Sequence, residues 1–124
     1  MWVFTPHGFI SIVEYQSPKA QPGEELLVRS RDAETLPKLF GPDLVVKLTP
    51  KADYRYRIIV SRQEAQRVLL GLLGDINYPN FKRSLPEGSG YKEAAGKCWG
   101  VMYDYQNDNW LPSPHVVESF GRKW

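Results

Sequence analysis

The sequence predicts an α+β fold built on a four-stranded antiparallel sheet. Apolar and polar residues alternate in several stretches, which is typical of strands that bury one face. Elsewhere, apolar residues recur at three- and four-residue spacing, which is typical of an amphipathic helix. The 124-residue chain is 42% hydrophobic and 24% charged, with a formal net charge of +2. This composition suits one globular domain, and so small a net charge does not by itself indicate a nucleic-acid partner.

The first half of the chain predicts four strands and a short helix. The strands are expected at about residues 8–15, 25–31, 44–49 and 53–60, where the alternation is clearest. Asp32 offers an N-cap for the helix between the second and third strands, and Gly41-Pro42 stops it. Because Pro37 would remove an interior hydrogen bond, we expect this helix to be kinked or shortened.

The second half predicts two longer helices. Ser61 and Glu64 have the spacing of a capping box, and the apolar residues that follow form one face: Ala65, Val68, Leu69, Leu72, Leu73 and Ile76. A second amphipathic run, from Tyr91 to near Gln106, predicts a final helix with Cys98 on its apolar stripe. We therefore expect Cys98 to be a buried, inert thiol.

The order strand, strand, helix, strand, strand, helix, helix fits a permuted ferredoxin-like sheet. Its four strands would lie in the order 1-2-4-3, with two helices on one face and the C-terminal helix and tail beyond them. Residues 1–106 are expected to form a single α+β domain. Residues 107–124 are expected to form a tail that docks on the body or on a partner, because this polar stretch still carries apolar anchors.

A basic face of this sheet is the main functional clue. The second and fourth strands are predicted neighbours, and the helices require the apolar residues of both strands beneath them. The cations of the predicted sheet therefore project from the other face: Arg29, Arg31, Lys47, Arg55 and Arg57. Of these, Arg29, Lys47, Arg55 and Arg57 are the predicted binding residues.

Three interpretations of the basic face remain open. The cations are solvated, they pair with acids of the last helix such as Glu93, Asp104 or Asp108, or they bind phosphate or carboxylate groups. Aromatic residues near the sheet, such as Phe9 and Tyr15, would also suit single-stranded nucleic acid. The sequence lacks the glycines of an RNA-recognition motif, which argues against that particular family.

No catalytic, metal-binding or cofactor-binding motif is present. The glycines at residues 88–90 do not form a phosphate-binding loop, and the two histidines, His7 and His115, are far apart in the sequence. A single cysteine rules out an internal disulfide and a multi-cysteine metal site. We therefore predict no catalytic residue, no metal ligand and no cofactor. A small enzyme would require His7, Asp53 and a tyrosine or arginine to converge in one pocket.

Aromatic residues gather at the start of the sequence, after the helix that begins near Ser61, and near the end: Trp2, Phe4, Phe9, Tyr78, Phe81, Trp99, Tyr103 and Trp110. They predict either a second small core or a surface that binds a partner. In the second case Trp110, Phe120 and Trp124 would anchor another subunit, and the protein would be a homo-oligomer. The N-terminus has no signal peptide and no segment is apolar enough to span a membrane, so a cytoplasmic location without a membrane partner is expected.

Four short segments resemble a family of small uncharacterised bacterial proteins. The segments are Met-Trp-Val-Phe-Thr with Gly-Phe after it in residues 1–9, Ala-Asp-Tyr-Arg-Tyr-Arg in residues 52–57, Ile-Asn-Tyr-Pro-Asn-Phe-Lys in residues 76–82, and Trp-Gly-Val-Met-Tyr in residues 99–103. The resemblance spans most of residues 1–106. It implies a single-domain cytosolic protein and brings no known activity.

The preferred functional hypothesis is a non-enzymatic binding module. Its basic sheet face would take an anionic ligand, an acidic protein partner or nucleic acid. The alternatives are a protein-interaction or homodimer module that works through the aromatic tail and the sheet, and a small enzyme without a recognised motif.

Overall fold

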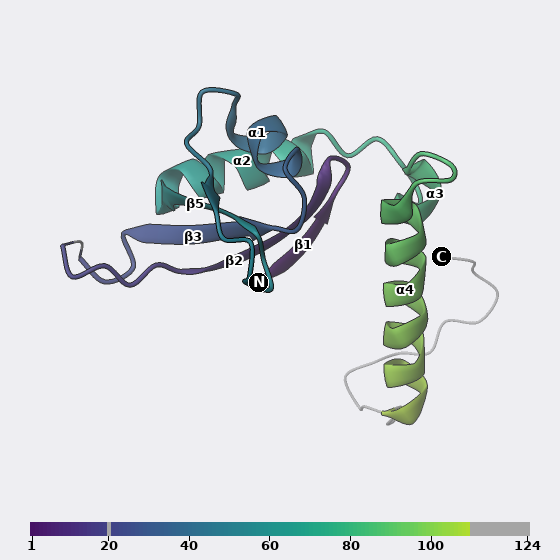
Figure 1. The fold of residues 1–124 in the computed structure, drawn as a ribbon. Coiled ribbons are helices and arrows are strands. Elements are labelled where there is room, and N and C mark those ends of the chain that lie inside the picture. Colours follow the sequence, from purple (N-terminus) through teal and green to yellow (C-terminus); the bar gives the residue numbers. More distant parts are fainter. Residues whose placement is uncertain (20, 110–124) are drawn as a thin grey trace.

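The computed structural model describes residues 1–19 and 21–109 and confirms the α+β class (Figure 1). Along the chain, the elements are β1 (Trp2–Thr5), β2 (Gly8–Glu14), β3 (Glu25–Ser30), α1 (Thr35–Phe40), β4 (Lys47–Leu48), β5 (Tyr56–Ser61), α2 (Arg62–Gly74), α3 (Phe81–Ser84) and α4 (Gly90–Asp108). The strands form one five-stranded sheet in the order β1-β2-β3-β5-β4, and every neighbouring pair is antiparallel.

The sheet differs from the expected one in its number of strands. Residues Trp2–Thr5 form an additional strand, β1, which pairs with β2 through a tight hairpin. The four-stranded ferredoxin-like arrangement is therefore not confirmed, although β2, β3, β5 and β4 are neighbours in that order within the larger sheet. The run at residues 44–49 supplies only two residues of regular strand, Lys47–Leu48. Alternation in so short a segment as β1 is too brief to predict a strand.

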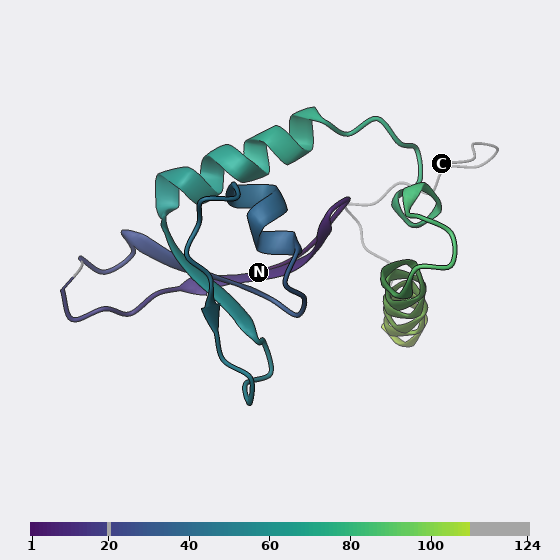
Figure 2. The same cartoon turned by 45° about the horizontal axis from the view of Figure 1, so that its top comes forward.

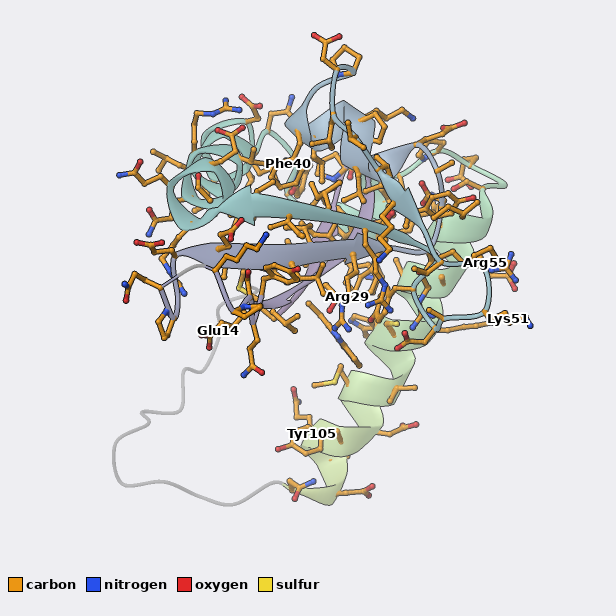
Figure 3. The ribbon with its side chains drawn as sticks, turned by 60° about the vertical axis from the view of Figure 1, so that its left-hand side comes forward. Glu14, Arg29, Phe40, Lys51, Arg55 and Tyr105 are labelled. Atoms are coloured by element: carbon orange, nitrogen blue, oxygen red, sulfur yellow. The ribbon has the colours of Figure 1, made fainter. Side chains whose placement is uncertain are left out.

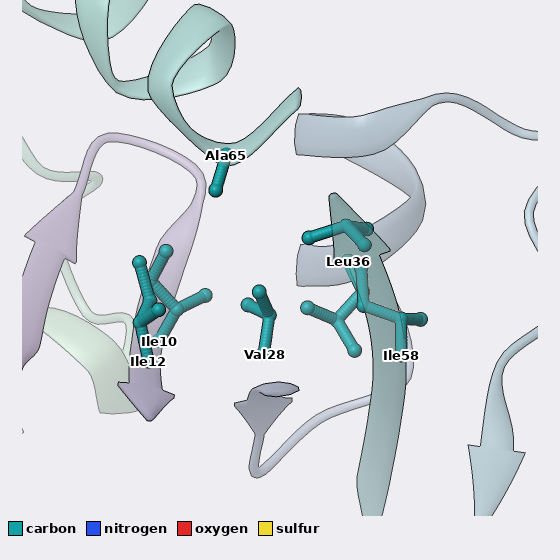
Figure 4. Close-up of a cluster of buried hydrophobic side chains, with 7 residues drawn as sticks. Ile10, Ile12, Val28, Leu36, Ile58 and Ala65 are labelled. Atoms are coloured by element: carbon teal, nitrogen blue, oxygen red, sulfur yellow. The ribbon is translucent and has the colours of Figure 1, made fainter. Parts of the chain in front are cut away.

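Both α1 and α2 lie over the same face of the sheet, which we call the core face (Figure 2). Strand residues that point to this side pack against apolar residues of the two helices. The buried cluster consists of Ile10, Ile12, Val28, Leu36, Ile58, Val60 and Ala65 (Figure 4). This cluster holds the central strands and the first two helices together, because burial of apolar surface is the main stabilising contribution to folding.

The first helix is short because hydrogen bonds to the Asp32 carboxylate delay its start until Thr35. One carboxylate oxygen of Asp32 accepts hydrogen bonds from the backbone N–H groups of Glu34 and Thr35, both at 2.9 Å. The helix therefore begins at Thr35, and Pro37 falls in its first turn, where a missing N–H costs little. The expected shortening is confirmed.

The second helix begins at the predicted cap. The Ser61 hydroxyl accepts a hydrogen bond from the Glu64 N–H at 3.1 Å, and α2 ends at Gly74. Ala65 and Val68 are buried, but Leu73 and Ile76 are 66% and 51% exposed. The predicted apolar face of this helix is therefore only partly covered, since its last turn extends past the core.

The last helix packs only by its first turns. In Figure 1, α4 runs away from the sheet, and Ala95 is its buried residue. Cys98 is exposed, so the expectation of a buried thiol is wrong. Beyond it, large apolar side chains are also exposed: Trp99, Val101, Met102, Tyr103 and Tyr105. The amphipathic pattern predicted the helix correctly but not its burial, because the second half of α4 extends beyond the sheet.

Candidate anion-binding face

The face of the sheet opposite α1 and α2, here called the second face, carries a line of cations. In the β3–β5 register Arg29 is directly opposite Arg57, and in the β4–β5 register Lys47 is also opposite Arg57. Directly opposed residues in a sheet have Cβ atoms about 4.5–5.5 Å apart and project to the same side. Arg29, Arg57 and Lys47 therefore form a cation row across three neighbouring strands.

The cation row has little internal compensation. Arg57 Nη2 lies 3.5 Å from Asp53 Oδ1, and its Nε donates to the Tyr54 carbonyl at 3.2 Å. Within residues 1–19 and 21–109 this is the only ion pair made by a member of the row, and the Asp53 side chain is 67% exposed. Exposed pairs of this kind contribute little free energy. The acids of α4 do not reach the row; Glu93, for example, pairs with Lys97 on its own helix.

Arg29 is held by neutral groups rather than by a carboxylate. Its Nη2 donates to the Ser11 hydroxyl on β2 at 2.8 Å, and its guanidinium carbon lies 4.6 Å from the centroid of the Tyr54 ring. The Nε atom is buried and has no hydrogen-bond partner among the described residues. A buried donor left without a partner costs roughly 1–3 kcal/mol. The positive charge of Arg29 is therefore fixed in place without being neutralised.

Tyr54 is the aromatic centre of this face. It is 4% exposed; Arg31 lies over the ring at 4.3 Å from its centroid, and the Phe9 ring stacks at 6.5 Å. Strict alternation along residues 53–60 predicts that Tyr54 shares a face with Tyr56, Ile58 and Val60, and this prediction is wrong. Regular strand begins only at Tyr56, so the alternation does not extend back to residue 54. Tyr54 consequently joins Arg29 on the second face.

Arg55 is the predicted binding residue that the structure does not bring into the row. It precedes β5, is exposed, and lies with Lys51 in the loop at the end of the β4–β5 hairpin, apart from Arg29 (Figure 3). Its carbonyl accepts a hydrogen bond from the Thr49 N–H at 2.7 Å, which fixes the loop rather than the sheet. Three of the four predicted binding residues are thus brought together.

An aromatic groove adjoins the row, between the second face and the first turns of α4. Its volume is about 420 Å³, and it is lined by Trp2, Phe4, Phe9, Arg31, Asp32, Tyr54, Tyr91, Ala94 and Cys98. The Tyr91 hydroxyl donates to the Thr5 carbonyl at 2.7 Å, and the ring stacks on Phe4 at 6.1 Å. Burial is the main cause that raises the pKa of Tyr91, so this hydroxyl keeps its proton. These contacts fasten α4 to β1 and leave the groove open.

A smaller hollow lies beside the other end of the row. Its volume is about 320 Å³, and it is lined by Tyr15, Leu27, Val45, Lys47, Arg57, Ile58 and Ile59. The row is therefore flanked by apolar surface on both sides. Of the aromatic residues near the row, sequence reasoning had named Phe9 and Tyr15, but it missed the contribution of Tyr54. Trp2 and Phe4 were recognised only as part of an aromatic group, because the alternation in β1 is too short to place them on one face of a strand.

The residues of a small enzyme do not converge. His7 lines a hollow between α1 and α2, whereas Asp53 lies in the loop before β5 and does not line that hollow. Across the described ranges, no group of three or more His, Cys, Asp or Glu side chains is placed to hold a metal ion. The predicted partner-binding residues Trp110, Phe120 and Trp124 lie outside the described residues.

Searches for similar proteins return no match among family models, curated proteins or solved structures. In the described part of the chain, no helix has both the length and the apolar character needed to cross a membrane. The geometry of the second face is therefore the basis for a functional proposal.

Proposed function

We propose that the protein is a binding module that holds an anionic ligand on the second face of its sheet. The observation that supports the proposal is the cation row, in which Arg29, Arg57 and Lys47 are in register with one long ion pair to offset them. Like charges directly opposite each other in a sheet are destabilising. An anion that lies across the row would remove this repulsion.

The shape of the row favours a ligand with several anionic groups. Neighbouring strands are about 4.7–4.9 Å apart, so the row from β3 to β4 spans roughly 10 Å. The two arginines can donate N–H groups to phosphate or carboxylate oxygens, and the lysine adds a point charge. A single small anion would satisfy only part of this arrangement.

The test is binding of polyanions to matched charge variants. Single-stranded DNA of about ten nucleotides, tripolyphosphate and polyglutamate serve as probes, with salt varied from about 50 to 200 mM. The variant Arg29→Gln/Arg57→Gln removes two charges from the row, while Arg62→Gln/Arg67→Gln removes two charges from α2. We expect the row variant to bind at least one of these probes about tenfold more weakly with a smaller salt dependence, and the α2 variant to bind within about twofold of the original protein.

Two results would overturn this proposal. One is equal weakening by the two double variants, which would show that only net charge matters. The other is a folded protein that binds none of the three probes at low salt. Far-ultraviolet circular dichroism of each variant checks that the sheet is intact.

Self-association through α4 is a second candidate function, which we propose on a separate observation. Trp99 and Tyr103 stack on each other at 5.3 Å, and both are about half exposed or more on the part of the helix that extends beyond the sheet. A second copy of the chain would bury this surface. Sedimentation equilibrium of the full chain and of Trp99→Gln/Tyr103→Gln tests it: a dimer that the double variant loses supports self-association, and a monomer at all concentrations contradicts it.

A further inference from the structure

We propose that the anionic ligand is single-stranded nucleic acid, with its phosphates along the cation row and unpaired bases in the aromatic groove. This inference rests on the proposed function and adds the class of ligand. It follows from the way in which the charged and aromatic parts of the second face are joined.

Tyr54 connects the two parts. Arg29, a member of the row, and Arg31, a wall of the groove, both lie over its ring, at 4.6 and 4.3 Å from the centroid. Phe9, another groove residue, stacks on the same ring. A ligand that uses the row and the groove together must therefore offer anionic groups and planar apolar groups within one short span.

The groove offers aromatic surface to planar groups. Trp2 is 73% exposed and meets Phe9 edge to face at 6.0 Å, so much of its indole is free to be covered. Phe4 is packed between Phe9 and Tyr91, which makes that wall rigid. Stacking of a base on an aromatic side chain is favourable and tolerates any base. The groove therefore suits unpaired bases without requiring a particular sequence.

Other polyanions match less of the surface. A duplex keeps its bases paired and stacked inside, so it would contact the row through phosphates and leave the groove unused. An acidic peptide supplies carboxylates to the row but places no regular series of planar rings beside them. Single-stranded nucleic acid alternates phosphates with bases. The apolar hollow at the other side of the row, beside Tyr15 and Lys47, gives a second place for a base.

The experiment separates the phosphates from the bases. The probes are decathymidylate, an abasic strand with the same number of phosphates, a duplex of equal length and polyglutamate. We expect decathymidylate to bind at least about tenfold more tightly than the abasic strand, which corresponds to about 1.4 kcal/mol or one stacked base.

A groove-filling variant gives the matched control. Ala94 is exposed on α4 and lines the groove, so Ala94→Trp should occupy it without altering any charge of the row. Asn107→Trp adds the same ring to the last turn of α4, away from the groove residues. We expect Ala94→Trp to remove the preference for decathymidylate while leaving abasic binding unchanged, and Asn107→Trp to keep the preference.

Each other outcome overturns the inference in a distinct way. If the abasic strand or the duplex bound as tightly as decathymidylate, the bases would not be bound in the groove. The proposed anion-binding function would then still stand. Tighter binding of polyglutamate than of decathymidylate would replace nucleic acid with an acidic protein. If the folded protein bound none of the four probes, both the inference and the proposed function would be overturned.

Discussion

Alternate residues of the same strands form the core face and the second face of the sheet. The core face buries apolar side chains, whereas the second face carries positive charges that few acids neutralise. On β3 and β5, Val28 and Ile58 are 0% and 2% exposed beneath α1 and α2. Their sequence neighbours Arg29 and Arg57 oppose each other on the second face, and the one ion pair that they make with a described acid joins Arg57 to Asp53 at 3.5 Å. Figure 3 shows Arg29 among the side chains in the middle of the sheet.

This difference between the two faces suggests that the core face stabilises the fold and the second face binds a ligand. The core face buries a cluster of apolar side chains between the strands and the two helices, whereas Arg29 Nε, a buried donor without a partner among the described residues, belongs to the second face. Natural proteins depart from complete satisfaction of polar groups mainly at functional sites. Substitutions on the core face should therefore lower stability, while substitutions on the second face should alter binding at small cost in stability.

The sharpest contrast in stability is between two adjacent isoleucines of β5. Ile58 is 2% exposed in the core, and Ile59 is 46% exposed on the second face. We expect Ile58→Ala to lower the free energy of unfolding by about 2–5 kcal/mol and Ile59→Ala by less than about 1 kcal/mol. Urea denaturation followed by circular dichroism measures both. Equal losses would show that the two faces contribute alike to stability.

The next effect concerns the contact between the β1–β2 hairpin and α1. Gly8 has a φ of 144°, and a Cβ there would lie 2.0 Å from the Thr35 hydroxyl oxygen. We expect Gly8→Ala to cost about 2–4 kcal/mol, from overpacking and from a positive φ. Gly41 also has a positive φ, of 105°, but open space around it, so Gly41→Ala is the control and should cost only about 1–2 kcal/mol. A thermal melt in which the two variants unfold together would contradict the packing argument.

The smallest effect tests how α4 is attached to the second face. Tyr91→Phe removes the hydrogen bond from the hydroxyl to the Thr5 carbonyl, which should cost about 1 kcal/mol at neutral pH. Because burial raises the folded-state pKa of Tyr91, the unfolded chain loses this proton first as the pH rises above about 10. The stabilisation is therefore complete below about pH 10 and declines above it.

The measurement for Tyr91 is the difference in unfolding free energy between the original protein and Tyr91→Phe, at neutral pH and at about pH 11. We expect the difference to shrink at high pH. The other tyrosines and the lysines titrate alike in both proteins, so their contribution to the pH dependence of stability cancels in this difference. A difference that grows with pH would contradict the stated direction of the pKa shift.

Much of the fold was predictable because local patterns and packing agree. The capping spacing at Ser61, the proline at residue 37 and the alternation along β3 each predicted a feature that the structure contains. The alternation also placed Arg29 and Arg57 on the same face of neighbouring strands, but it does not fix the register, which the structure shows to set them directly opposite each other. Local rules succeed here because the core face requires one orientation of these strands.

The features that escaped prediction depend on contacts between distant segments. Trp2–Thr5 is a strand because it pairs with β2, and Tyr54 changes faces because regular strand begins only at residue 56. Cys98 lies on the apolar stripe of α4, but only the first turns of this helix pack against the sheet. The amphipathic pattern therefore overestimated the burial of Cys98. The groove joins β1 to α4, segments that are far apart in the sequence.

The most direct test of the account is an NMR titration that observes arginine side chains. The Nε–H signals of Arg29 and Arg57 report the second face, and those of Arg62 and Arg67 report α2 on the core side. On addition of decathymidylate, we predict saturable shifts of the Arg29 and Arg57 signals, with the Arg62 and Arg67 signals unchanged. Shifts confined to Arg62 and Arg67, or no shift at saturating ligand, would contradict the claim that the second face is the binding site.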